Sequence, residues 1–384
     1  MTELLAFAAQ RIFDSATWTE NSALLVDAGR VVATVSAKDV PSNAHRADLT
    51  GILVPGFVDL QVNGGGGVLF NNQTDVAGIK AICSSHAQFG TTALLPTLIT
   101  DTVPVNLAAL AAGATAAAES VPGFLGLHLE GPHLAVSRKG AHDPALIRPM
   151  TEDDLQRLLA ARALLPNLMV TVAAETVTAR QITRLSQAGI IVSIGHSDAT
   201  AETAEAAFAA GASQATHLFN AMSQMQGREP GVVGAALAAQ HVYAGLIADG
   251  IHVHPTTIRL ALAAKVQAGH IFLVTDAMSQ TGTDIQSFSL TGRTVTRADG
   301  ALRLENGTLA GADLDMIDAI HFIHEEIGLT WEEALRMASL YPARAIRAEE
   351  CHGHLMPGAL ANFVELNDDM RVQSTWINGN KVHG

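Results

Sequence analysis

Three side chains that commonly bind catalytic metals each follow a short apolar run. Glu130 lies in LHLEGPH, His196 in IGHSD and His217 in THLFN. Two imidazoles and one carboxylate that leave coordination positions open can form a catalytic metal site, which lowers the pKa of bound water to about 7. We therefore predict a metal site that activates water, with Glu130, His196 and His217 among the candidate ligands.

Two more polar side chains follow later apolar runs, His252 in ADGIH and Asp276 in VTDAM. A carboxylate at Asp276 could take a proton from the attacking water and pass it to a leaving nitrogen. The alternatives are a helix N-cap for Asp276 and a hydrogen-bonded structural role for each histidine taken alone. A catalytic role is favoured because polar side chains follow several apolar runs along the chain in the same way.

The elements that must position these side chains are apolar, β-rich runs that alternate with Ala-rich helical stretches. The runs are Phe57–Leu60, Thr92–Leu98, Phe124–Leu129, Leu168–Ala173, Ile190–Ile194, Gln214–Leu218, Ala244–Ile247 and Ile271–Val274. Each is nearly continuous, which is typical of parallel strands buried on both faces. They predict an α/β fold, a (β/α)8 TIM-like barrel whose strand ends meet at one mouth; the alternative is a doubly wound open sheet.

The two ends of the chain instead show strand–turn–strand patterns. Examples are Ala23–Val26 before Val31–Val35, and Val372–Ile377 before the hairpin signal Asn378–Gly379. Neither end has enough strands to bury a sheet face alone. We therefore predict a small β-sandwich domain built from residues 1–54 plus 355–384, with residues 55–354 forming the barrel.

Composition limits the partners. Hydrophobic residues make up 48% of the chain and charged residues 16%, which favours a large core over disorder. The formal net charge of −14 argues against nucleic acid and membrane surfaces as partners. The first ten residues lack the basic segment of an export signal, so we expect a cytoplasmic protein.

Over nearly its whole length the chain resembles the amidohydrolase superfamily and, within it, the N-acetylglucosamine-6-phosphate deacetylases. The motifs that carry the resemblance are PGFVD (55–59), LEGP (129–132), KGAH (139–142), GHS (195–197), THLFNAM (216–222), REPGVVG (228–234), ADGIH (248–252), VTDAM (274–278) and NGTLAG (306–311). The pair HLFNAM and REPGVVG is specific to the deacetylases, whereas PGFVD or VTDAM alone would indicate only the superfamily.

The resemblance implies an enzyme that hydrolyses N-acetyl-D-glucosamine 6-phosphate to D-glucosamine 6-phosphate and acetate. It implies metal ligands at Glu130, His196 and His217 and a catalytic acid/base at Asp276. The implied substrate contacts are Ala141, His142, Asn220, Ala221, Arg228, Asp249, Gly250, Ile251, His252, Leu309, Ala310 and Gly311. In relatives the arginine of REPGVVG reaches the phosphate of a sugar bound in the neighbouring subunit, which implies a homodimer.

The chain departs from the superfamily pattern where a second metal would bind. Many members carry His-x-His after the first strand and a lysine after the fourth; here Gln61 and Asn63 follow the first, and Ala174–Glu175 the fourth. Amides ligate divalent metals poorly compared with imidazole, so we predict one divalent metal per subunit. The ligands suit zinc first, and also iron, cobalt, manganese or nickel.

Three functions therefore follow from the sequence. The first is the deacetylase described above. The second is a related amidohydrolase acting on N-acetylgalactosamine 6-phosphate or another N-acyl substrate, because residues 223–227 (SQMQG) replace the stretch common before the REPGVVG arginine. The third is a non-catalytic sugar-phosphate sensor, which the retained Asp276 argues against.

Overall fold

Eight parallel strands form the central sheet of this computed structural model, which describes residues 4–265 and 268–384. They are β6 (Phe57–Val62), β9 (Thr91–Ile99), β10 (Leu127–Glu130), β11 (Leu168–Val172), β12 (Ile191–Ile194), β13 (Gln214–Ala215), β14 (Tyr243–Leu246) and β15 (Ile271–Leu273). Strands that follow one another in the chain also lie side by side, in the order β15-β14-β13-β12-β11-β10-β9-β6. A doubly wound sheet would reverse this order at a switch point. The predicted barrel is confirmed.

The barrel closes between its first and last strands. A parallel bridge joins Val62 to Ala277, and the Asp276 N–H donates to the Gln61 carbonyl at 3.0 Å. Closure therefore brings the segments after β6 and β15 together, which places two of the predicted site regions side by side.

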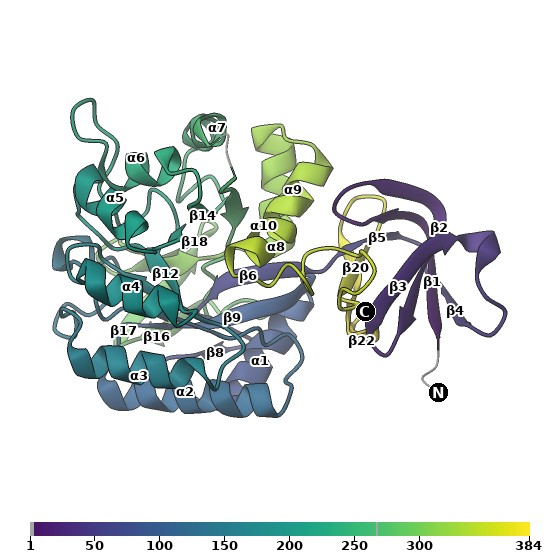
Figure 1. Cartoon of the computed structure of the whole chain (residues 1–384), viewed down its shortest axis with the longest axis horizontal. Coiled ribbons are helices and arrows are strands. Elements are labelled where there is room, and N and C mark those ends of the chain that lie inside the picture. Colours follow the sequence, from purple (N-terminus) through teal and green to yellow (C-terminus); the bar gives the residue numbers. More distant parts are fainter. Residues whose placement is uncertain (1–3, 266–267) are drawn as a thin grey trace.

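Helices surround the barrel (Figure 1). They are α1 (Val76–Ala87), α2 (Val103–Ala118), α3 (Glu152–Arg162), α4 (Ala179–Gln187), α5 (Ala201–Ala209), α6 (Gly231–Ala238), α7 (Pro255–Ala264), α8 (Met316–Phe322), the π-helix Ile323–Ile327, α9 (Trp331–Ala338) and α10 (Leu340–Ala345). Side-chain caps mark the first turn of several helices. At α3 the Thr151 side chain accepts from the Asp154 N–H in a capping box. Within the described residues, no helix is both long and apolar enough to cross a membrane.

Both ends of the chain contribute to one further sheet, at the right of Figure 1. Its strands are β1 (Leu5–Phe13), β2 (Trp18–Asp27), β3 (Arg30–Ser36), β4 (His45–Asp48), β5 (Ile52–Pro55), β20 (Phe363–Leu366), β21 (Val372–Ile377) and β22 (Asn380–His383). One edge of β1 pairs first with β4 and then with β5. The domain predicted as a small sandwich is thus one sheet that branches at β1. Within it, β5 from the N-terminal segment pairs with β20 from the C-terminal segment.

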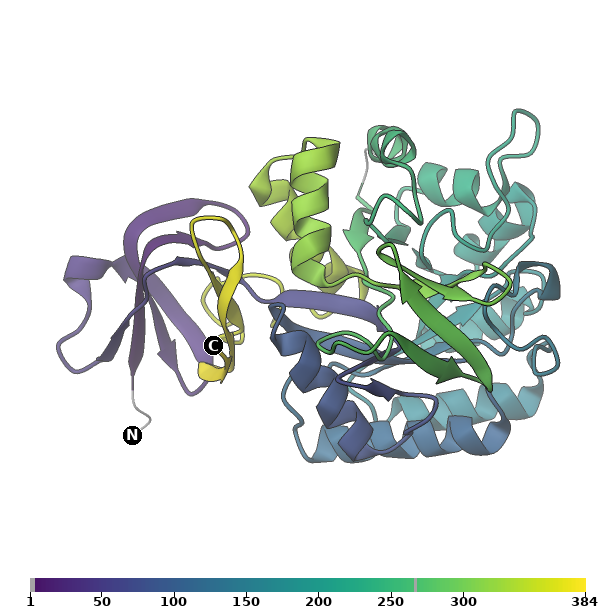
Figure 2. The same cartoon turned by 180° about the vertical axis from the view of Figure 1, so that it is seen from behind.

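A second, smaller sheet is formed by the segment between β15 and α8 in the sequence, and it was not predicted. Its antiparallel strands are β16 (Ser287–Leu290), β17 (Arg293–Ala298), β18 (Ala301–Leu304) and β19 (Leu309–Ala312), drawn in green in Figure 2. Leu290, Val295, Leu302 and Leu304 form its buried face, which packs on Ile99 and Met278 beside the barrel mouth. The sheet therefore packs directly beside the predicted site.

The glycine run Gly64–Gly67 forms a packed hairpin with β7 (Gly64–Gly65) and β8 (Val68–Leu69). His86 Nε2 lies 2.9 Å from the Gly64 carbonyl oxygen, and a Cβ added to Gly64 would approach the Val68 carbonyl oxygen to 2.3 Å. Close backbone packing therefore explains Gly64, and the run is not among the residues that line the cavity described below.

Candidate active site

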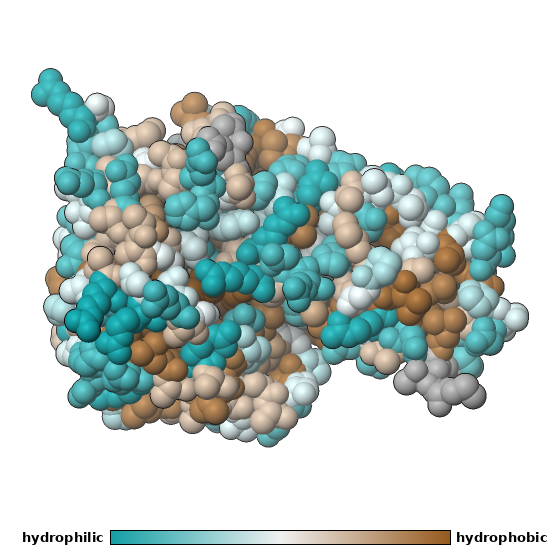
Figure 3. All heavy atoms as spheres, in the orientation of Figure 1, coloured by the Kyte–Doolittle hydropathy of each residue, from teal (hydrophilic) through white to brown (hydrophobic). Residues whose placement is uncertain are grey.

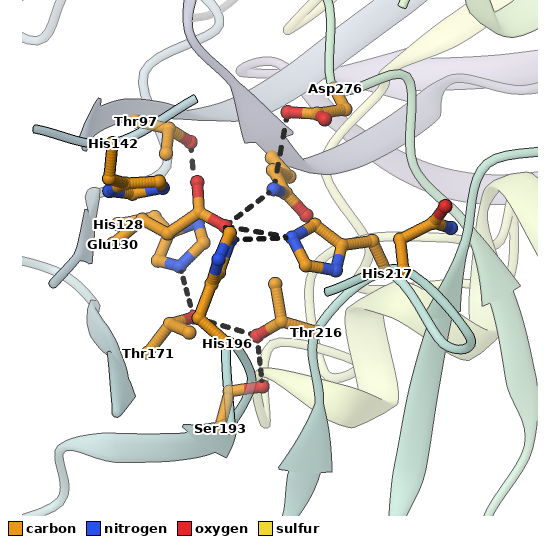
Figure 4. A network of polar contacts seen from close by, with 12 residues as sticks. Thr97, His128, Glu130, His142, Thr171, Ser193, His196, Thr216, His217 and Asp276 are labelled. Carbon is orange, nitrogen blue, oxygen red and sulfur yellow. Dashed lines mark hydrogen bonds and ion pairs between the residues drawn. The ribbon is translucent and has the colours of Figure 1, made fainter. Parts of the chain in front are cut away.

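The three side chains predicted to bind a metal meet at the barrel mouth (Figure 4). Glu130 is the last residue of β10, and His196 and His217 each lie two residues after β12 and β13. Glu130 Oε1 lies 3.2 Å from His196 Nε2 and 3.0 Å from His217 Nε2, and these nitrogens are 3.1 Å apart. All three residues are at most 5% exposed, so one oxygen and two nitrogens converge on one point away from bulk water.

An unusual backbone conformation turns these side chains into the mouth. His196 and His217 have φ angles of +48° and +30°, and Asp276, which follows β15, has +50°. Non-glycine residues rarely adopt this left-handed region, which costs about 1–3 kcal/mol per residue and is concentrated at functional sites. The surrounding barrel therefore holds three predicted site residues in strained conformations.

The donor set fits a cation. His196 Nδ1 lies 2.7 Å from the Arg138 carbonyl oxygen and donates to it, so in the neutral ring the Nε2 lone pair faces the Glu130 oxygen. Burial raises the pKa of Glu130, but its hydrogen bonds with His196 and His217 outweigh burial and hold that pKa well below its ordinary value. An ionised carboxylate and a nitrogen lone pair that face each other are stabilised by a proton or metal ion between them.

His142 lies beside this cluster as a neutral hydrogen-bond donor. Its Nδ1 accepts from the Thr100 N–H at 3.3 Å and lies 2.8 Å from Thr100 Oγ1, so the proton of the neutral ring is on Nε2. Burial, followed by the nearby His196, lowers the pKa of His142 to about 3. A nitrogen of His142 is also within 4.8 Å of the ligand atoms of Glu130 and His196.

Two amides bind the carboxylate of Asp276. Its Oδ1 accepts from Asn63 Nδ2 at 2.6 Å and from Gln61 Nε2 at 3.2 Å, and Gln61 Nε2 also donates to Glu130 Oε1 at 3.2 Å. Burial and the charge of Glu130 raise the pKa of Asp276 to about 6. Gln61 and Asn63 therefore both lie beside Asp276, and Gln61 connects the two carboxylates.

Beneath the site, two buried polar contacts were missed by the sequence analysis. His128 Nε2 lies 2.7 Å from Thr171 Oγ1, in a hydroxyl network that continues through Thr216 to Ser193 (Figure 4). Asp59 accepts from Thr275 Oγ1 at 2.5 Å across the β6–β15 closure. In the sequence, the signal for these contacts was a single polar residue within an otherwise apolar run.

A cavity of about 390 Å³ opens above these residues. Its lining includes, besides the cluster, these predicted substrate contacts: Ala141, His142, Asn220, Ala221, His252, Leu309, Ala310 and Gly311. Asp249, Gly250 and Ile251 are not in the lining. Asp249 instead positions the ring of His252, whose Nδ1 donates to Asp249 Oδ2 at 2.6 Å; its Nε2 has no hydrogen-bond partner within residues 4–265 and 268–384.

Arg228 does not reach this cavity from its own chain. Residues 224–230 form an exposed loop before α6. This loop projects from the barrel in Figure 1 and has hydrophilic side chains at its tip in Figure 3. Its base is held by Glu229, whose Oε1 accepts from the Ala201 and Gly231 N–H groups at 2.7 and 3.0 Å. The loop thus presents Arg228 outward.

Comparisons with known proteins agree with this architecture. Residues 52–382 match the sequence model of the amidohydrolase family. The N-acetylgalactosamine-6-phosphate deacetylase of Shewanella sp. (strain ANA-3) is 42% identical over 376 residues, which cover 97% of this chain and 94% of that protein. The N-acetylglucosamine-6-phosphate deacetylase of Haemophilus influenzae is 36% identical and covers 93% of each chain.

Among solved structures, the N-acetylglucosamine-6-phosphate deacetylase from Pasteurella multocida superposes with a TM-score of 0.95. That protein is 38% identical, and the superposition covers 99% of this chain and 100% of that one. The barrel, the small sheet and the inserted strands therefore form one arrangement that the relative shares over its whole length.

Proposed function

The chain belongs to the amidohydrolase family, and from this we propose that it deacetylates an N-acetylamino-sugar 6-phosphate. The substrate we propose first is N-acetyl-D-glucosamine 6-phosphate, which yields D-glucosamine 6-phosphate and acetate. The observation that carries the proposal is the convergence of Glu130, His196 and His217 to within 3.2 Å of one another, beside Asp276, in a cavity of about 390 Å³.

Glu130, His196 and His217 would hold one divalent cation, with zinc as the first candidate. Bound there, it would polarise the acetyl carbonyl and lower the pKa of the attacking water. Gln61 and Asn63 occupy the place where a second pair of imidazoles would be needed, and both donate to carboxylate oxygens. A single-cation site is therefore part of the proposal.

Asp276 and His142 then carry out the proton transfer and charge stabilisation. Asp276 accepts a proton from the attacking water as the new C–O bond forms, and it delivers that proton to the amide nitrogen as the C–N bond breaks. His142 donates from Nε2 to the carbonyl oxygen as negative charge develops there, a contribution worth about 3–4 kcal/mol in comparable sites. The neutral state of His142 suits this role.

We further propose a homodimer in which Arg228 contacts the phosphate of a sugar bound in the other subunit. The exposed position of the 224–230 loop supports this, because Arg228 is not among the residues that line the cavity of its own chain. His252 lines the cavity of its own chain, and its Nε2 has no hydrogen-bond partner among the described residues, so it would contact the phosphate bound in that cavity.

The galactosamine epimer is a second candidate substrate. The Shewanella relative, at 42% identity, is named for N-acetylgalactosamine 6-phosphate, whereas the Haemophilus relative at 36% is named for the glucosamine epimer. Both candidates share the acetamide and the phosphate, so the residues described here would act on either in the same way.

Acetate release by metal-reconstituted protein tests the proposal. The substrates are N-acetylglucosamine 6-phosphate, N-acetylgalactosamine 6-phosphate and the two sugars without phosphate. We expect rapid turnover of the first, with kcat/KM at least 100-fold above that of its phosphate-free counterpart. Preference for the galactosamine compound would move the assignment to the second candidate, and absence of acetate release from every compound would refute deacetylation.

A further inference from the structure

We propose that Arg303 is a second phosphate-binding residue, supplied to the cavity by the same chain that holds the catalytic cluster. The inference rests on the proposed function, since it concerns how the 6-phosphate is recognised. Among the described residues that line the cavity, Arg303 is the only lysine or arginine. No motif of the sequence analysis included it.

The inserted sheet places the Arg303 side chain at the cavity. Arg303 in β18 is paired with Leu309 in β19, and directly paired residues of neighbouring strands project from the same face. Leu309 lines the cavity, and so does Arg303. The flanking Leu302 and Leu304 point to the opposite face, where they are buried. Strand alternation therefore directs the Arg303 side chain away from the face that Leu302 and Leu304 bury.

The charge of Arg303 is available to a ligand. Its Nη1 donates to the Gly307 carbonyl oxygen at 3.1 Å, and no carboxylate within the described parts of the chain forms an ion pair with it. Other arginines near the mouth are engaged: Arg138 pairs with Asp198 at 2.8 Å, and Arg293 donates to the Ala141 carbonyl oxygen. The contact with Gly307 uses one N–H group and leaves donors for a phosphate.

Electrostatics favour a cationic residue within the cavity of each chain. The chain carries a formal net charge of −14, and the carboxylates that line the cavity are Glu130 and Asp276. A dianionic phosphate entering this field needs a local cation, and arginine binds phosphate through two parallel N–H donors. Arg228 depends on a second subunit, whereas Arg303 is present in each cavity as soon as the chain folds.

Steady-state kinetics of Arg303 variants test the inference. We expect Arg303→Ala to raise KM for the 6-phosphate about 10- to 100-fold, because a charge-assisted contact to the ligand is lost. The kcat value should stay within about threefold, since the reacting atoms are untouched. Arg303→Lys should recover part of the affinity, because it restores the charge but not the two-pronged contact.

A matched control is Arg180→Ala, which removes one exposed positive charge in α4 that is not part of the cavity lining. The KM of Arg180→Ala for the 6-phosphate should equal that of the wild type. On the phosphate-free sugar, Arg303→Ala should have the kcat/KM of the wild type. Inorganic phosphate should inhibit Arg303→Ala about 10-fold more weakly than the wild type.

Different results would refute the role of Arg303 and the proposed function. If the wild-type protein hydrolyses the 6-phosphate preferentially but Arg303→Ala keeps the wild-type KM, the role of Arg303 is wrong and the proposed function stands. If the wild-type protein has no preference for the phosphorylated sugar, the proposed function fails first.

Discussion

Replacing Asp276 with asparagine should nearly abolish turnover while leaving the site assembled. An asparagine oxygen can accept from Asn63 Nδ2 and Gln61 Nε2 as the carboxylate does, at 2.6 and 3.2 Å. The amide then has the right shape and hydrogen bonds but cannot accept or deliver a proton. Because Glu130, His196 and His217 are not altered, the metal content should match that of the wild type.

The loss of rate follows from the role of the proton carrier. General acid–base catalysis by a positioned side chain contributes about 10²- to 10⁴-fold. At 1.36 kcal/mol for each factor of ten, this corresponds to about 3–5 kcal/mol of transition-state stabilisation. We therefore expect kcat of Asp276→Asn to fall by at least 100-fold.

The same substitution should stabilise the metal-free protein at neutral pH. Burial and the charge of Glu130 raise the pKa of Asp276 from 3.8 to about 6, so the folded state holds this proton more tightly than the unfolded state. Stability therefore falls as the pH rises from 3.8 to about 6, by up to about 3 kcal/mol. Asparagine avoids this cost, so the variant should be the more stable protein above pH 6 and equal to the wild type below pH 4.

Three measurements decide the matter: acetate release, metal per chain, and urea unfolding of chelator-treated protein from pH 4 to 8. Near wild-type turnover in the variant would refute the role of Asp276. Equal stability of the two proteins at pH 8 would refute the argument from burial and the Glu130 charge.

Three further predictions concern other parts of the molecule. His217→Ala should lose most of its metal on dialysis, because one of three converging ligand atoms is removed; elemental analysis checks this, and full metal content would contradict the ligand assignment. Asp154→Asn should lower the free energy of unfolding by about 1–3 kcal/mol at pH 7, because Arg148 and Arg157 lose their partner. Burial raises the pKa of Asp154, but Arg148 and Thr151 outweigh it and hold the pKa below 3.8, so this difference should shrink as the pH falls below 3.8; a constant difference down to pH 3 would argue against the ion pairs. Arg228→Ala should raise KM about 10-fold for 6-phosphates only, and an unchanged KM would remove Arg228 from phosphate binding.

Much of the barrel could be predicted because parallel strands buried on both faces leave a strong signal. Each of the eight apolar runs overlaps a strand of the barrel, and the two-residue strand Gln214–Ala215 was found because its run continues to Leu218. The convergence of Glu130, His196 and His217 then followed from one rule, that strand ends meet at one mouth.

The inserted sheet was missed because its strands are short and mix buried apolar with exposed polar residues, as in β17 (Arg293–Ala298). Signals for it were present. Thr291–Gly292 and Asp299–Gly300 are two-residue hairpin turns, and all four residues have positive φ angles between 48° and 77°. The approach of Arg303 to the cavity could not be read in this way, because it depends on where the whole sheet packs.

The pairing of β5 with β20 has a consequence for synthesis of the chain. β5 ends at Pro55 and β20 begins at Phe363, so about 300 residues must leave the ribosome before this strand edge is covered. At about 5–20 residues per second, that takes roughly 15–60 s. During this interval the β5 edge is an open template for pairing with another nascent chain. A strand near the C-terminus thus covers an edge that has been exposed since early in synthesis.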